Sequence, residues 1–82
     1  MDNLINLNDL SVGQNCIVVN VNNTGIMRRR LMDIGIVPGC LLSCVLDSPS
    51  GNPRCYLVKG SLIALRNCDS CLIEVKLLWK LL

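Results

Sequence analysis

Histidine and phenylalanine are absent from this chain of 82 residues, and its acidic residues number only six. General acid–base or nucleophilic catalysis needs a paired carboxylate site, or a nucleophile with a base such as histidine beside it. The six carboxylates are scattered along the sequence, as Asp2, Asp9, Asp33, Asp47, Asp69 and Glu74. We therefore expect no catalytic residue and no enzymatic activity.

Aromatic residues and net charge are also scarce. Tyr56 and Trp79 are the two aromatic residues, and the formal net charge is +2. Nucleic-acid binding depends on many cations that neutralise phosphates, and single strands are also held by aromatic stacking platforms. The sequence therefore predicts no nucleic-acid partner.

Long apolar runs are missing as well. No window approaches the roughly 18 apolar residues that a membrane span needs. The first residues, Met1, Asp2 and Asn3, lack the basic start of a secretory signal. These features predict a cytoplasmic protein, and in a reducing compartment its six cysteines are expected to be thiols.

Aliphatic residues, in contrast, are plentiful, since hydrophobic residues make up 51% of the chain. A chain of this length has room for one domain with one small core. We expect residues 1–82 to form that single domain, with residues 76–82 as an apolar C-terminal extension.

Short extended segments alternate with turns along most of the sequence. After a short helical turn near residues 8–14, strands are predicted at residues 15–21, 40–46, 54–58 and 62–65, and a last strand at residues 72–76 or beyond. In the first strand Ile17, Val19 and Val21 form the wholly apolar face, and Cys16 lies on the mixed face. Five short strands predict a mainly β fold, a small barrel.

One short helix is predicted at residues 26–34. Met27, Leu31 and Ile34 recur there at helical spacing. Gly35 follows as a left-handed C-terminal cap, so the helix has a definite end.

This helix and the turn after it resemble the signature of the FeoA family, an arginine-led helix that leads into a proline-glycine turn. The residues that carry the resemblance are Arg28-Arg29-Arg30-Leu31-Met32-Asp33-Ile34-Gly35-Ile36-Val37-Pro38-Gly39. Further blocks are similar to the family in the same order: its opening turn at residues 10–13, its central hairpin at 48–60, and its last strands at 62–66 and 72–75. The resemblance covers residues 7–75.

The resemblance implies an SH3-like barrel and an accessory role in bacterial ferrous iron uptake. It also implies a partner, FeoB, a membrane ferrous iron transporter whose cytoplasmic portion contains a GTPase domain. The expected function is binding and regulation of that transporter, in particular through its GTPase region. The candidate partner-binding residues are Arg28, Arg29, Arg30, Leu31, Gly35, Pro38, Gly39 and Trp79.

The three arginines also have a simpler interpretation, a solvated helix face. Successive helix positions point about 100° apart, so Arg28, Arg29 and Arg30 cannot form one cluster. Arg29 is placed to pair with Asp33 one turn later.

Iron itself has no predicted site in this chain. Ferrous iron prefers imidazole and carboxylate ligands, and the sequence has neither histidine nor an acidic cluster. We expect no cofactor and no metal ligand, because regulation of a transporter requires only contact with it.

Cys68 and Cys71 form a CxxC motif, which supports an alternative function as a thiol-based transition-metal or redox protein. The spacing lets two thiolates approach one soft metal ion or each other. Cys40 and Cys44 lie about 13 Å apart on one strand, so only one of them could join a shared site. Three cysteines are interpreted as small hydrophobic residues of the core, namely Cys16, Cys44 and Cys55.

The apolar segment at residues 76–82, which contains Trp79, leaves several alternatives open. It could extend the last strand, form a homo-oligomer with a second copy, or contact a partner or membrane surface. It could also fold back over its own barrel.

Overall fold

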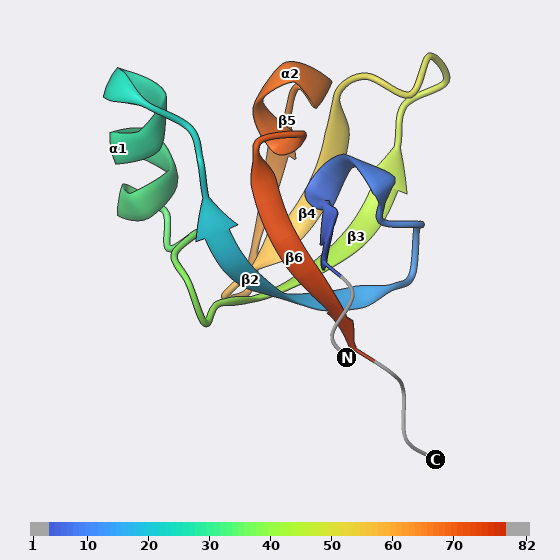
Figure 1. Ribbon diagram of the computed structural model, residues 1–82. Helices are drawn as coiled ribbons and strands as arrows, with labels where there is room; N and C mark the ends of the chain where they lie inside the picture. The colour runs from blue at the N-terminus through green and yellow to red at the C-terminus, as the bar shows by residue number, and fades with distance from the viewer. Residues whose placement is uncertain (1–3, 79–82) are drawn as a thin grey trace.

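The computed structural model describes residues 4–78. This part of the chain consists of six strands and three short helical segments (Figure 1). In chain order they are β1 (Leu4–Asn6), the 3-10 turn η1 (Leu7–Asp9), β2 (Asn15–Val21), α1 (Gly25–Asp33), β3 (Leu41–Asp47), β4 (Arg54–Val58), β5 (Ser61–Leu65), α2 (Asn67–Ser70) and β6 (Ile73–Leu78). None of these helices is long and apolar enough to cross a membrane.

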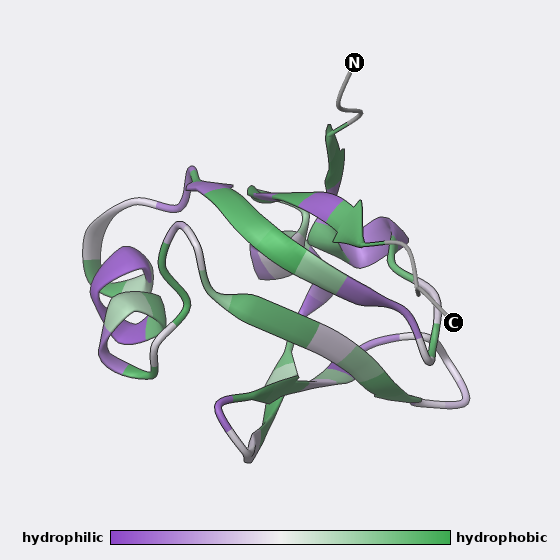
Figure 2. Ribbon diagram, turned by 90° about the horizontal axis from the view of Figure 1, so that it is seen from below, coloured by the Kyte–Doolittle hydropathy of each residue, from purple (hydrophilic) through white to green (hydrophobic). Residues whose placement is uncertain are grey.

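All six strands form one antiparallel sheet in the order β1-β6-β2-β3-β4-β5. The sheet curls around the core, with α1 to one side of it (Figure 1). The strands hold most of the hydrophobic ribbon, whereas α1 is largely hydrophilic (Figure 2). The prediction of a mainly β fold is confirmed, and α1 lies where the one short helix was predicted, between the strands that begin at residues 15 and 41.

The two ends of the described chain lie side by side in the sheet, which the sequence analysis does not predict. β1 pairs with β6, with Ile5 opposite Val75. β6 also pairs with β2 and continues to Leu78, so the last strand runs past Lys76, as the sequence analysis allows. Residues 76–78 of the expected C-terminal extension thus belong to the sheet, and Trp79 lies outside the described residues.

The buried face of β2 is the mixed one rather than the wholly apolar one. Cys16 and Val18 are buried, whereas Ile17 and Val19 are only half-buried. The register against β6 shifts between Val18 and Asn20. A β-bulge of this kind moves the side chains of the following residues to the opposite face of the sheet. Val21 is therefore buried on the same face as Cys16 and Val18.

The core consists of aliphatic residues, three cysteines and one aromatic residue, Tyr56, whose side chain is fully buried. The Tyr56 hydroxyl donates to the carbonyl oxygen of Leu7 at 3.5 Å. Arg54, also buried, donates from Nη1 to the carbonyl oxygen of Asn8 at 2.7 Å, and its Nε lies 3.4 Å from Asp47 Oδ1. These contacts attach η1 to β4. The buried hydrophobic residues are Leu7, Leu10, Cys16, Val18, Val21, Leu31, Ile36, Cys40, Leu42, Cys44, Tyr56, Val58, Leu65, Ile73 and Val75.

Candidate functional site

Helix α1 is held on the sheet by few contacts. Leu31 is its one buried residue, 1% exposed, and Met27 packs partly against the same core. Just before the helix, Asn23 Nδ2 donates to the carbonyl oxygen of Asp69 at 3.0 Å. After the helix, Gly35 has a φ of +100°, as its predicted role in ending the helix requires. Leu31 therefore anchors α1 on the core.

The three arginines of α1 have three different environments. Arg28 donates from Nη1 to the carbonyl oxygen of Val21, at the end of β2. Arg29 is exposed, and no ion pair joins it to Asp33, although both residues are described. Arg30 lies beside a hollow in the surface. The prediction that they do not form one cluster is confirmed, and the pairing of Arg29 with Asp33 is not observed.

The turn after α1 is fixed to the sheet by its main chain. The Cys40 amide donates to the Val37 carbonyl oxygen at 3.0 Å, and Gly39 between them has a φ of +93°, as in the predicted type II turn. The Gly39 amide also donates to the carbonyl oxygen of Val18 at 2.8 Å. Pro38 and Gly39 are exposed, so both remain available to a partner.

Gly35 is close to the turn between β4 and β5. A Cβ atom at this position would lie 3.2 Å from Cδ of the Lys59 side chain. The absence of a side chain at Gly35 therefore lets Lys59 pass over the end of α1. This close approach joins the end of α1 to the turn before β5.

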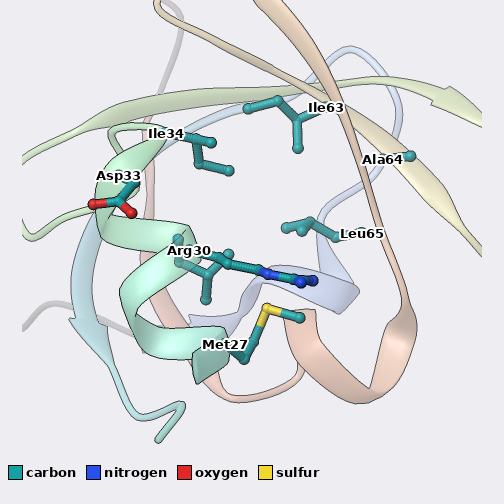
Figure 3. A pocket seen from close by; sticks show the side chains of 8 residues that line it. Met27, Arg30, Asp33, Ile34, Ile63, Ala64 and Leu65 are labelled. Atoms are coloured by element: carbon teal, nitrogen blue, oxygen red, sulfur yellow. The ribbon is translucent and has the colours of Figure 1, made fainter. Parts of the chain in front are cut away.

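A hollow of about 340 Å³ lies between α1 and β5 (Figure 3). Met27 on the helix and Ile34 just after its end face Ile63 and Leu65 on the strand, while the Arg30 side chain extends across the opening (Figure 3). Asp33 lies at the rim and points away. The lining residues are Met27, Arg30, Leu31, Asp33, Ile34, Ile63, Ala64 and Leu65.

A second hollow of about 330 Å³ shares Met27, Arg30, Ala64 and Leu65 with the first. It adds Arg66 and Asp69 from the segment that follows β5. We call the two together the α1–β5 groove. The helical spacing of Met27 and Ile34 indicates one wall of this groove, but the β5 wall depends on the sheet order and carries no sequence signal.

The six cysteines divide by burial. Cys16, Cys40 and Cys44 are buried and Cys55 is half-buried, so the core interpretation of Cys16 and Cys44 is confirmed. Burial raises the pKa of both the Cys16 and Cys44 thiols. Cys68 and Cys71 are exposed on α2 and just after it, where Cys71 Sγ lies 3.4 Å from the carbonyl oxygen of Cys68. Within residues 4–78 no group of three or more cysteine or acidic side chains is placed to hold a metal ion.

Exposed and buried thiols should differ strongly in reactivity. In the folded protein at neutral pH, we expect a pulse of iodoacetamide to modify Cys68 and Cys71 at least about a hundredfold faster than Cys16 and Cys44, because the buried thiols react only after local opening. Mass spectrometry of the peptides measures each rate. In concentrated guanidinium chloride the six rates should converge, and fast modification of Cys16 in the folded protein would contradict the packing described above.

Comparisons with known proteins agree on one family. The sequence model described as the FeoA domain matches residues 5–77. A curated relative from Porphyromonas gingivalis, the Fe(2+) transport protein A/Fe(2+) transporter FeoB fusion protein, is 31% identical over 72 residues. That match covers 88% of this chain but only 8% of the relative, so this chain corresponds to a small part of the fusion protein.

Solved structures confirm the expected SH3-like architecture. The FeoA protein from Chlorobium tepidum has a TM-score of 0.87 at 32% identity, with 92% of this chain and 71% of that chain covered. Iron(II) transport protein A from Clostridium thermocellum has a TM-score of 0.85 at 27% identity, with 89% and 45% covered. FeoA from Stenotrophomonas maltophilia, solved with zinc and described as a prokaryotic SH3 domain protein, has a TM-score of 0.78 at 25% identity, with 87% and 88% covered.

Proposed function

This chain belongs to the FeoA family, and from that premise we propose that it is a non-enzymatic, cytoplasmic accessory module of ferrous iron uptake. Its partner is the membrane transporter FeoB, which it binds through the transporter's cytoplasmic region, including the GTPase domain, and regulates. Iron is the cargo of the transporter and is not held by this chain.

The observation that carries this proposal is the fusion protein of Porphyromonas gingivalis, in which the part similar to this chain is joined to FeoB. Covalent linkage keeps two domains at a high effective concentration. Such a linkage is useful when the two domains act on each other, and it supports the same pairing for this chain.

The α1–β5 groove is the surface that fits a partner best. It combines an apolar floor of Met27, Ile34 and Ile63 with the guanidinium groups of Arg30 and Arg66 at its rim. Protein interfaces commonly have an apolar centre and a polar rim. Arg29, Pro38 and Gly39 are exposed on the same helix and its following turn and extend this surface, whereas Arg28, Leu31 and Gly35 position it. Trp79 remains a further candidate contact.

An NMR titration of the labelled full chain tests this proposal. The soluble cytoplasmic domain of FeoB from the same genome is added in reducing buffer, and ferrous iron is added in a separate experiment. We expect amide shifts that cluster in α1, residues 36–39 and β5 with the domain, and no site-specific effect of iron alone. An absence of shifts with the domain at high micromolar concentration would contradict the proposed function.

A second candidate function rests on the exposure of Cys68 and Cys71, which lie three residues apart around one turn of helix. This pair offers two sulfur ligands to a soft metal, or the two halves of a disulfide. A cobalt(II) titration under reducing conditions distinguishes the metal function, because bound thiolates give charge-transfer bands. Spectra without such bands would remove the metal function.

A further inference from the structure

Strand β5 is an edge of the sheet. Within residues 4–78 it pairs with β4 alone. An edge strand presents unpaired N–H and C=O groups to which another strand can add, and natural proteins usually protect such edges with charged residues or proline. The five residues of β5, Ser61-Leu62-Ile63-Ala64-Leu65, include neither. The free edge of β5 is therefore open to pairing with a further strand.

The turn before β5 determines which of its main-chain groups are free. Lys59 and Gly60 have φ values of 49° and 83°, as a two-residue type I′ turn requires, so Val58 and Ser61 form a hydrogen-bonded pair. Such pairs alternate along an antiparallel ladder. The next hydrogen-bonded pair is therefore at Ile63, and the main-chain groups of Leu62 and Ala64 point to the free edge.

This free edge faces the α1–β5 groove. Consecutive side chains of a strand point to opposite faces, yet Ile63, Ala64 and Leu65 all line the same hollow. Because residues from both faces of β5 line this hollow, the hollow runs along the edge of the strand. Helix α1 forms the opposite wall of the hollow (Figure 3). A strand added to β5 would lie between β5 and α1, with apolar side chains of both elements beside it.

The charges at the groove select the occupant. Arg30 and Arg66 both line the second hollow, together with Asp69, and neither arginine makes an ion pair within the described part of the chain. Asp33 also lines the first hollow, but its side chain points away from it (Figure 3). The two guanidinium groups and the Asp69 carboxylate that remain leave a positive excess, which favours an acidic segment. A second copy of β5 would bring like charges together, and residues 79–82 of this chain carry Lys80 and no acidic side chain.

We propose that an extended acidic segment of the partner adds to the free edge of β5 as a further strand. The N–H and C=O groups of Leu62 and Ala64 bond to its main chain, one apolar side chain fills the hollow between Met27 and Ile63, and a carboxylate reaches Arg30 or Arg66. This mode of binding, in which main-chain bonds hold the strand and side-chain pockets select it, rests on the function proposed above and specifies where and how the partner is held.

Amide hydrogen exchange measured by NMR tests the added strand directly. In the free protein the Leu62 and Ala64 amides should exchange fast, whereas the Ile63 amide, bonded to β4, should exchange slowly. With the FeoB cytoplasmic domain in excess, we expect exchange at Leu62 and Ala64 to slow at least about tenfold. Binding without this protection would overturn the inference and leave the proposed function intact, and no binding at all would overturn both.

Two pairs of variants sharpen the result. Ala64→Pro removes the edge N–H without affecting the bonds to β4, and it should abolish protection and weaken binding. Ala64→Thr keeps this N–H, so it should weaken binding less than the proline does. Arg30→Glu should weaken binding at least about tenfold, and Arg30→Lys, which keeps the positive charge, should weaken it much less. If Ala64→Pro does not fold, the Arg30 pair and the exchange rates decide.

Slow exchange of the Leu62 and Ala64 amides in the free protein would overturn the inference. If the free protein then has a dimeric mass, a second copy occupies the edge. If truncation of the chain after Leu78 makes these amides exchange fast, the chain's own tail occupies it.

Discussion

Replacement of Leu31 by alanine should lower the free energy of unfolding by about 2–5 kcal/mol. Leu31 is 1% exposed and is the one buried side chain of α1, so its removal leaves a cavity under the helix as well as a loss of apolar burial. The exposed Ile26 and Met32 cannot compensate by moving inward, because they lie on other faces of the helix. Urea unfolding of the full chain followed by circular dichroism measures the change.

Met32→Ala is the matched control for this prediction. Met32 is on the same helix, one residue further on, and is 47% exposed. Its replacement should change the free energy of unfolding by less than about 0.5 kcal/mol. A loss of less than about 1 kcal/mol for Leu31→Ala would show that α1 does not depend on this contact, and the wall of the α1–β5 groove would need another anchor.

The parts of the fold that the sequence predicts well are those set by local stereochemistry. The end of α1 depends on the left-handed conformation of Gly35, and the turn after it depends on Pro38 and Gly39. Both are properties of single residues and their neighbours. The same local signals carry the resemblance to the FeoA family, which is why family and fold could be predicted together.

The parts that the sequence does not predict are set by contacts between distant residues. β1 has only three residues and is a strand because β6 lies beside it. The bulge in β2 changes which residues after Val18 point into the core. Nothing in the alternation of Ile17, Val19 and Val21 indicates that bulge. Strand boundaries and faces therefore follow from pairing rather than from local preference.

The candidate site shows the same division. Sequence reasoning finds the helix, because helical spacing is visible in the sequence, and it names Arg30 and Leu31 of this wall as candidate contacts. It does not find Ile63, Ala64 or Arg66, since their place opposite α1 follows from the position of β5 at the end of the sheet order. The sequence therefore indicates a function through the family, but it does not indicate which surface of the fold is the site.

Stability should fall steeply as the pH rises above 9. Burial, reinforced by the nearby Cys40 and Cys44 thiols, raises the pKa of Cys16 from 9.0 to about 12. Between these values the unfolded chain releases this proton while the folded chain keeps it, so the folded state is favoured below pH 9 and loses that advantage as the pH rises. The slope from Cys16 alone is about 1.4 kcal/mol per pH unit, which amounts to about 4 kcal/mol by pH 12. Burial also raises the pKa values of Cys44 and Tyr56, and both add to the slope in the same direction.

Cys16→Val isolates the contribution of this thiol. Valine is apolar, suits a strand and cannot ionise, so the variant should fold, and its loss of stability between about pH 9 and 11 should be shallower than that of the parent by about 1.4 kcal/mol per pH unit. Denaturant midpoints measured in a thiol-free reductant at each pH give the two slopes. Cys68→Val is the matched control, because it makes the same change at an exposed thiol outside the core. Equal slopes for the parent and Cys16→Val would mean that Cys16 ionises as readily in the folded chain as in the unfolded one, and hence that the junction of β2 and β3 is open to water.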